Sequence, residues 1–437
     1  MKKLKYIFDI RKEERVFDAI LRSSFLNLIA KGSGYLRSVA VAVLLGFSAK
    51  TDAFFMALSL IGIFLIFADV FDSIGVPNLV RARTENREEF ERLSGLLFGF
   101  TLLLTFMVGF LALVLYPAVL KIPIGFNKED LSYTKIAYFL LIPYLLSSFI
   151  FHHFGAILRS VRRFTHYFLS QFIISFSNFL FTVFGLLAYK SWLVLPISLS
   201  IAQILGTLYI LMVGKEFIYI RLYFNETTKK ILKHFFYLSA LYGASSIFTV
   251  TDRAFASLLG EKAVSALFYG YLVASIPHGV LRLENIAITS LAEAGGSIEK
   301  LNFYIKKILT ITVPTGLTLS ILSDAVTRLL FGYGAFSHTD ITLTSEAVRF
   351  FSIGIPFGFI WSILYRVFQI REALKPVFFI ATTGVIANIL LNYLLVVRLH
   401  YGIMGICLAT FGANLFLCVA GYAILKMTGY ESASSRF

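Results

Sequence analysis

The stretch SGLLFGFTLLLTFMVGFLALVLYPAV, from Ser94 to Val119, decides the fold of this chain because it contains no charged residue. A helix needs roughly 20 apolar residues to cross a bilayer, and this stretch is longer. Eleven other runs are similarly apolar, at 24–46, 53–80, 136–158, 165–189, 192–213, 235–260, 263–292, 308–332, 347–370, 376–397 and 402–425. The sequence predicts an all-α polytopic membrane protein of about twelve transmembrane helices. Since the long runs 53–80 and 263–292 contain prolines, eleven or thirteen helices are the alternatives.

The composition also favours a membrane protein. Charged residues make up 15% of the chain and hydrophobic residues 58%, whereas soluble domains carry about 25% charged residues. The formal net charge is +15, but the basic residues lie in short loops between the apolar runs. This placement favours a membrane topology over a nucleic-acid surface, and no nucleic-acid partner is expected. The two cysteines, Cys407 and Cys418, share one apolar run and predict neither a disulfide framework nor a metal site.

The loop charges predict the orientation. If the N-terminus is cytoplasmic, the cytoplasmic segments hold most of the lysines and arginines, including Arg81, Arg83 and Arg87 after the second run and Arg159, Arg162 and Arg163 after the fourth. Short cytoplasmic loops carry the excess of basic residues in membrane proteins. We therefore expect a multi-pass protein of the bacterial cytoplasmic (inner) membrane, with both termini in the cytoplasm.

A short repeat predicts two lobes. Leu-Leu-Gly occurs at 44–46 and again at 258–260, each time with a Phe eight positions after the Gly. We expect an N-lobe at 24–213 and a C-lobe at 235–426, each of six helices, around a central cavity suited to alternating access. The remaining segments are an N-terminal segment at 1–23, a cytoplasmic amphipathic linker at 214–234 and a cytoplasmic tail at 427–437. Residues 1–23 are either an interfacial amphipathic helix or a solvated basic tail.

Two cations in the first predicted helix are candidates for substrate binding. Ionisable residues inside a membrane span are costly and usually mark a cavity or a pathway. Lys31 and Arg37 lie about 120° apart around a helix axis, so both can reach one wide cavity. Two fixed cations suit an anionic substrate such as a pyrophosphate. The alternative is a pair of structural cations bonded to carboxylates of the second helix.

Three further residues belong with these candidates. Asp52 and Asp69 lie in the second predicted helix and are expected to hold Lys31 and Arg37 in place. Arg253 lies in the seventh and is grouped with the substrate-binding residues. An N-cap is the alternative role for Asp52, which opens its helix.

A second group of residues carries oxygen atoms. Asp252 lies in the seventh predicted helix, Asn388 and Asn392 lie one turn apart in the eleventh, and Thr410 lies in the twelfth. Carboxylate, amide and hydroxyl oxygens are the ligands that hard cations prefer, so these residues form a candidate sodium site. The alternative is that the asparagines join helices by hydrogen bonds. Sodium or proton coupling is left open, and no other metal or cofactor is expected.

Several motifs are absent from the sequence. It contains no G-x-x-x-x-G-K-[ST], G-x-S-x-G or H-E-x-x-H, and no long segment that could house a nucleotide-binding domain. We expect a transporter that is not an enzyme, binds no nucleotide and has membrane lipids and a lipid-linked anion as partners.

Four stretches resemble the MurJ/MviN family of the multidrug, oligosaccharidyl-lipid and polysaccharide exporter superfamily. The first runs from Lys31-Gly-Ser-Gly-Tyr-Leu-Arg37 to Thr-Asp-Ala-Phe-Phe at 51–55, and the second is Thr-Asp-Arg-Ala-Phe-Ala-Ser at 251–257. The third is Phe-Gly-Tyr-Gly-Ala-Phe at 331–336, with Asp340 and Thr344 following. The fourth runs from Ile355-Pro356 through Lys375-Pro376 to Asn388, Asn392 and Leu-Ala-Thr at 408–410.

This resemblance implies a fold and a function. The fold is two six-helix lobes in a V shape, and the function is flipping of lipid II, a polyprenyl-pyrophosphate-linked peptidoglycan precursor needed for cell-wall biogenesis and cell shape. By the same resemblance, Arg37 and Lys31 match cationic cavity positions and Asp52 matches the aspartate that opens the second helix. Asp252, Asn388, Asn392 and Thr410 approximately match a proposed sodium site, with Asn392 in place of a carboxylate.

Three departures from the family pattern keep other substrates open. The sequence stops soon after the twelfth run, so it resembles a short form without the family's last two helices. Residues 61–67 read Ile-Gly-Ile-Phe-Leu-Ile-Phe where the family has Pro-Asn and paired arginines, and Leu272 replaces an arginine. The alternatives are a flippase for an O-antigen-like lipid-linked oligosaccharide and a cation-coupled multidrug antiporter. A positively charged cavity favours a flippase, and a negatively charged one favours the antiporter.

Overall fold

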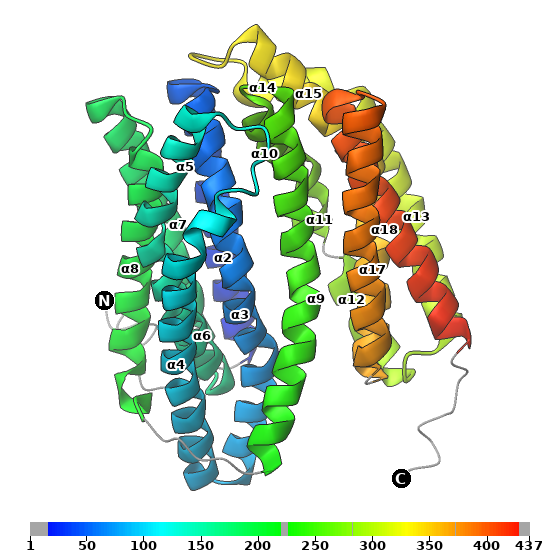
Figure 1. The fold of residues 1–437 in the computed structure, drawn as a ribbon. Helices are drawn as coiled ribbons and strands as arrows, with labels where there is room; N and C mark the ends of the chain where they lie inside the picture. Colours follow the sequence, from blue (N-terminus) through cyan, green and yellow to red (C-terminus); the bar gives the residue numbers. More distant parts are fainter. Residues whose placement is uncertain (1–15, 220–225, 282, 372, 428–437) are drawn as a thin grey trace. The chain divides into compact units, whose positions relative to one another are not determined.

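The computed structural model describes residues 16–219, 226–281, 283–371 and 373–427 (Figure 1). Within these ranges the chain is almost entirely helical and contains no β-strand. The first half comprises α2 (Val16–Leu45), α3 (Ala49–Glu85), α4 (Arg87–Val119), α5 (Lys128–Leu140), α6 (Ile142–Ser160), α7 (Phe164–Tyr189), α8 (Val194–Gly214) and the short turn η1 (Lys215–Phe217). The second half comprises α9 (Glu226–Ala256), η2 (Ser257–Leu259), α10 (Ala263–Ala274), α11 (Ile276–Leu281), α12 (Leu283–Glu293), α13 (Ile298–Ile321), α14 (Ser323–Phe331), α15 (His338–Ile353), α16 (Ile355–Ile370), α17 (Leu374–Asn392), η3 (Tyr393–Arg398) and α18 (Gly402–Met427).

The helices form two compact units. Unit 1 contains residues 1–45, 57–121 and 129–239 so far as they are described, and unit 2 contains residues 46–56, 122–128 and the described part of 240–437. Some helices are divided between the units: α3 begins in unit 2, α9 begins in unit 1, and the first residue of α5, Lys128, belongs to unit 2. The predicted lobes at 24–213 and 235–426 and the V-shaped cavity remain predictions.

Unit 1 is built on helices that pack along their length. α2 packs against α7, α7 against α8, and α6 against both α4 and α8. Figure 1 shows α4, α6, α7 and α8 running side by side. The buried hydroxyl of Tyr138 on α5 donates to the Ala112 carbonyl of α4 at 2.9 Å. This bond satisfies a polar atom that would otherwise be unpaired in an apolar interior.

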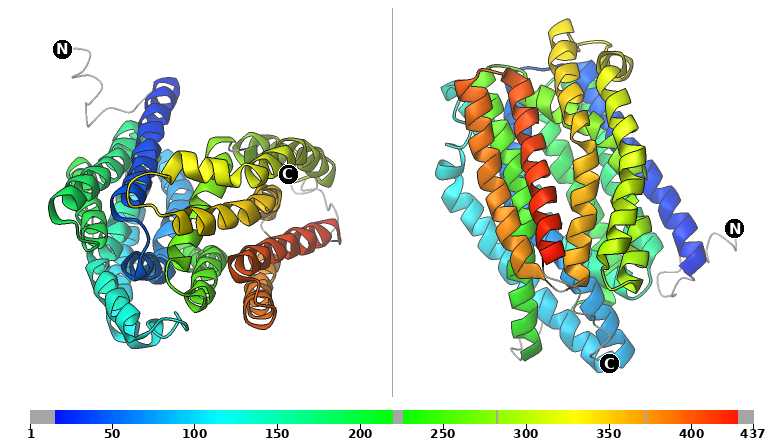
Figure 2. Two further views of the ribbon diagram at one scale, coloured as in Figure 1. Left: turned by 90° about the horizontal axis from the view of Figure 1, so that it is seen from above. Right: turned by 90° about the vertical axis from the view of Figure 1, so that its right-hand side faces the viewer.

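Unit 2 has its core around α16. Phe359, Ile363, Leu364 and Val367 of this helix are at most 1% exposed. They are surrounded by α12, α13 and α18, and α17 lies beside α18 in both views of Figure 2. α17 ends at Asn392 and continues directly into η3, a π-helical turn. Such wider turns are rare and are frequently found at functional sites.

Membrane-spanning helices account for most of the described chain. Among the residues that the structure describes, nine helices are long and apolar enough to cross a bilayer, or up to eleven if each of two bent pairs is one span. All twelve predicted runs fall on helical segments of the structure. The run at 235–260, which falls on α9, is the one outside these eleven, and α9 carries Asp252 and Arg253. This is an all-α polytopic membrane protein, although the count of twelve spans remains a prediction.

Four of the predicted runs are not single helices. The expected continuous spans at 136–158, 263–292, 308–332 and 347–370 are interrupted, the last two by bends of 71° and 47°. Three of the interruptions have the same local cause, since each new helix starts with Ile-Pro, at Ile142-Pro143, Ile276-Pro277 and Ile355-Pro356. Proline lacks an N–H and disfavours helical geometry in the residue before it, so it is favoured in the first turn of a helix and often marks a break before it.

Candidate functional site

Lys31 and Arg37 both lie on α2 in unit 1. Lys31 is exposed and Arg37 is half-buried. The Arg37 Nε donates to the Thr182 hydroxyl of α7 at 3.4 Å, and that hydroxyl in turn donates to the Asn178 side chain at 3.3 Å. Arg37 is therefore anchored to α7 by a hydrogen bond to a hydroxyl group.

The face of α2 next to Lys31 is open within the described structure. A Cβ built at Gly32 or at Gly34 would have no described heavy atom within 4 Å. Gly32 and Gly34 are separated by Ser33 and lie on different faces of the helix, and the absence of a side chain at each lets a bulky group approach the backbone there. The exposed Lys31 ammonium and the open backbone at Gly32 leave room for a large anionic group.

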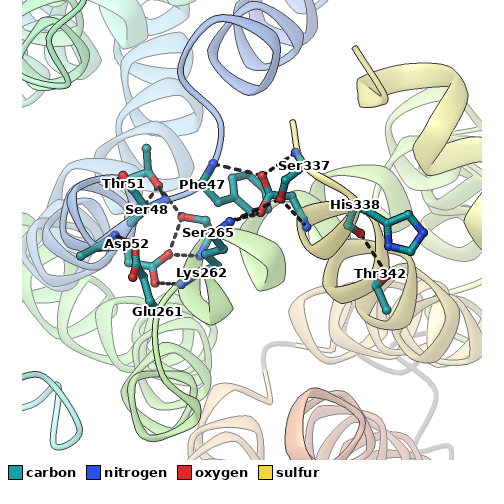
Figure 3. A network of polar contacts seen from close by, with 12 residues as sticks. Phe47, Ser48, Thr51, Asp52, Glu261, Lys262, Ser265, Ser337, His338 and Thr342 are labelled. Atoms are coloured by element: carbon teal, nitrogen blue, oxygen red, sulfur yellow. Dashed lines mark hydrogen bonds and ion pairs between the residues drawn. The ribbon is translucent and has the colours of Figure 1, made fainter. Parts of the chain in front are cut away.

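Asp52 makes its described contacts with the start of another helix of unit 2. It is 1% exposed and lies in the first turn of α3, in unit 2. Its carboxylate accepts hydrogen bonds from the Lys262 amide at 2.6 Å, from the Ser265 amide at 2.8 Å and from the Ser265 hydroxyl (Figure 3). These amides belong to the start of α10, so Asp52 caps a helix other than its own.

Arg253 also makes contacts within unit 2. Its guanidinium donates to the Phe55 carbonyl of α3 at 2.6 Å and lies over the Phe268 ring, 5.5 Å from its centroid. Phe55 and Phe268 stack on each other with centroids 4.1 Å apart. These contacts give Arg253 a role in holding the start of α3, alongside the predicted role in substrate binding. Asp69 lies within α3, but its side chain is outside the described structure.

Asp252, Asn388, Asn392 and Thr410 come together, as the sequence predicts for a shared site. The Asp252 carboxylate on α9 accepts from the Asn388 amide at 3.2 Å, from the Asn392 amide at 3.0 Å and from the Thr410 hydroxyl. Asp252 is 6% exposed and both asparagines are 0% exposed. Three helices, α9, α17 and α18, thus converge on one buried carboxylate.

Hydrogen bonds between the helices do not account for every polar atom of this cluster. The Oδ1 atoms of Asn388 and Asn392 are buried and have no hydrogen-bond partner among the described residues. Buried polar atoms are nearly always paired, and an unpaired one calls for an ion or a water molecule. The donor set of one carboxylate, two amides and one hydroxyl fits a monovalent hard cation.

The sequence analysis missed a set of residues that surround Asp52. We call these the capping network: Phe47, Ala49, Asp52, Glu261, Lys262, Ser265, Ser337 and Asp340. They come from three separate parts of unit 2 and join through hydrogen bonds and one ion pair. The only local signal in the sequence is the Ser-x-x-Asp pattern at 337–340, which forms a capping box at the start of α15.

Comparisons with known proteins agree over nearly the whole chain. The sequence model of the family described as lipid II flippase MurJ matches residues 41–433. A protein of Thermotoga maritima named as a probable lipid II flippase MurJ is 26% identical, covering 93% of this chain and 84% of its own length. A protein of Rickettsia prowazekii with the same name is 25% identical over 87% of this chain and 78% of its own.

A solved structure shows the same fold. The structure of a lipid II flippase MurJ in an inward closed conformation matches with a TM-score of 0.77 and 23% identity, covering 92% of this chain and 87% of its own. The family match begins near the end of α2, after Lys31 and Arg37, and includes α9, α17 and α18, which carry the Asp252 cluster. The chain belongs to the lipid II flippase MurJ family.

Proposed function

We propose that this chain is a transporter that flips a polyprenyl-pyrophosphate-linked cell-wall precursor, with lipid II as its substrate, across the bacterial inner membrane. The observation that carries this proposal is the family match over residues 41–433, together with relatives named lipid II flippases that align over most of their length. The positive-inside rule supports cytoplasmic N- and C-termini.

Lys31 and Arg37 are the proposed contacts of the pyrophosphate. A pyrophosphate carries several negative charges, and the guanidinium of Arg37 offers a planar fork of donors that suits phosphate oxygens. The exposed Lys31 and the open backbone at the neighbouring Gly32 support an approach of the headgroup to α2.

The Asp252 cluster is the proposed coupling site. Sodium is the ion that we propose for this site, since carboxylate, amide and hydroxyl oxygens are the ligands of a hard cation and the Asn388 and Asn392 oxygens have no hydrogen-bond partner among the described residues. Asn392 contributes a neutral amide where the family pattern has a carboxylate. Among the four residues of the cluster, only Asp252 therefore carries a formal charge. A site with fewer charges binds a cation more weakly.

A second candidate substrate has specific support. Leu272 and the apolar stretch at 61–67 stand where the family pattern has arginines. Loss of these cations changes which headgroup the chain recognises. A flippase for another lipid-linked oligosaccharide is therefore the alternative.

Complementation tests both proposals. A strain depleted of its essential lipid II flippase receives the wild type, Lys31→Ala, Arg37→Ala or Arg22→Ala, with protein levels in the membrane measured by immunoblot. We expect rescue by the wild type and by Arg22→Ala, a control on the same helix, and loss of rescue for Arg37→Ala at normal protein level. Loss of one charged contact of about 2–3 kcal/mol lowers binding by roughly 30- to 150-fold.

The other outcomes are equally informative. Rescue by a well-expressed Arg37→Ala variant would refute the pyrophosphate contact. Failure of a well-expressed wild type to rescue would favour the alternative oligosaccharide substrate, which a strain lacking an O-antigen flippase would then test.

A further inference from the structure

Two helices of unit 2 cap each other. The Asp52 carboxylate on α3 accepts the Lys262 and Ser265 amides at the start of α10. In return, the Glu261 carboxylate, one residue before Lys262, accepts the Ala49 amide at the start of α3 at 2.9 Å (Figure 3). Carboxylates at helix N-termini satisfy unpaired amides and interact favourably with the helix dipole. If the starts of α3 and α10 separate, the Ala49 amide of α3 and the Lys262 and Ser265 amides of α10 therefore lose their acceptors.

Lys262 takes part in this arrangement with both its backbone and its side chain. Its backbone is in the left-handed region, with φ +78° and ψ −13°. This conformation is unfavourable for a residue with a side chain and persists only when neighbouring contacts hold it. The conformation directs the Lys262 amide towards Asp52, so the strain is coupled directly to the cap of α10.

The Lys262 side chain supplies the holding contact. Its Nζ forms an ion pair with Asp340 at 2.9 Å and donates to the Ser337 hydroxyl at 3.3 Å. Asp340 is 1% exposed, and its other oxygen accepts the Ser337 amide at 2.9 Å and the Phe47 amide at 3.4 Å. The buried Asp340 carboxylate thus contacts both Lys262 and the loop that leads into α3.

We propose that Lys262 and Asp340 are positioning residues that hold residues 46–56 on unit 2 by fixing the direction of the Lys262 amide towards Asp52. Residues 46–56 continue on both sides into chain that belongs to unit 1. The strength of this hold determines how readily the start of α3 is released. Its bearing on transport rests on the proposed function, whereas the hold itself does not.

Amide hydrogen exchange of the full-length protein in detergent, followed by mass spectrometry, measures the hold directly. Lys262→Ala should raise the exchange rate of peptides covering 46–56 and 261–268 by about tenfold or more, because a buried charge loses its partner. Lys262→Arg keeps the cation and should stay near wild type. Lys262→Gly loses the cation but adopts the left-handed conformation freely, so its exchange should fall between alanine and wild type.

Asp324→Asn is the matched control. Asp324 forms an ion pair with Arg328 at 2.7 Å within the neighbouring helix α14, and both side chains are 49% exposed. Removal of such an exposed pair has little effect, so exchange at 46–56 should be unchanged. Asp340→Asn should match Lys262→Ala, and the double variant should be no worse than either single variant.

Three results would overturn the proposal. They are wild-type exchange at 46–56 in Lys262→Ala, equal exchange in the alanine and glycine variants, and additive effects of Lys262→Ala and Asp340→Asn. Size-exclusion chromatography checks that each variant is folded, and Lys262→Arg keeps the test valid if the alanine variant aggregates. Because exchange is measured without substrate, its outcome is independent of the complementation test.

Discussion

The Asp252 carboxylate is held by donors that carry no charge. Two asparagine amides and the Thr410 hydroxyl bond to it, and the remaining amide oxygens of Asn388 and Asn392 are unpaired among the described residues. Burial of a carboxylate is costly unless hydrogen bonds and positive charge compensate it, and the neighbouring Arg253 guanidinium supplies part of that charge. The arrangement is therefore well suited to bind an ion and to lose stability without it.

Sodium should stabilise the purified protein through this site. In detergent, the thermal midpoint should rise when choline chloride is replaced by sodium chloride at equal ionic strength. Sodium at 100 times its Kd adds about 2.7 kcal/mol to the stability of the folded state. Asp252→Asn should abolish the rise, and Asp324→Asn, which changes an exposed carboxylate, should keep it. A rise of equal size in Asp252→Asn would show that sodium acts elsewhere.

At the scale of the helices, close packing in unit 2 depends on glycine. A Cβ placed at Gly270 on α10 would overlap the Cβ of Ala347 on α15. Small residues let two helices approach closely, which strengthens packing within a membrane. By contrast, a Cβ at Gly358 on α16 would have no described atom within 4 Å.

Substitution of these two glycines should have opposite effects. Gly270→Ala forces α10 and α15 apart, and overpacking of this kind costs about 1–3 kcal/mol, so the thermal midpoint should fall. Gly358→Ala should leave it unchanged or slightly raised, because alanine favours a helix by up to about 1 kcal/mol over glycine. Thermal unfolding of both variants in the same detergent makes the comparison. A midpoint for Gly270→Ala at or above that of Gly358→Ala would contradict this packing.

The limits of prediction from sequence lie at this same scale. The apolar runs identify where helices occur, since hydropathy averages over about 20 residues. They do not show where a helix breaks, although Pro143, Pro277 and Pro356 mark three of the breaks. Asp52 was assigned to the right helix, but its partners Lys262 and Ser265 lie more than 200 positions away. No spacing rule reaches that far, so only the folded structure identifies the capping network.

At the scale of the whole molecule, the exterior is apolar where lipid is expected. α4 exposes a row of large apolar side chains that includes Leu103, Phe106 and Phe110, with Phe106 76% exposed. A soluble protein rarely exposes so continuous an apolar surface. In a bilayer the same surface is the favourable one, because lipid offers no hydrogen bonds.

A charge on this surface should prevent normal insertion. Phe106 lies near the middle of α4, where a lysine costs about 2.5–3.5 kcal/mol on insertion. Phe106→Lys should therefore lower the amount of protein in the membrane, measured by fluorescence of a fused reporter. Phe106→Ala, which removes the ring without adding charge, should stay near wild type. Equal levels for the two variants would place this face of α4 away from lipid.

The reciprocal caps of α3 and α10 restrict how the sequence can change over generations. A substitution at Lys262 removes the ion-pair partner of the buried Asp340 carboxylate. A substitution at Asp52 leaves the Lys262 and Ser265 amides without an acceptor. Accepted changes at these positions should therefore occur in pairs, with 262 and 340 varying together and 52 varying with 265. Among related sequences, substitutions at positions 52, 262, 265 and 340 should therefore be correlated, even though these positions are spread over most of the chain.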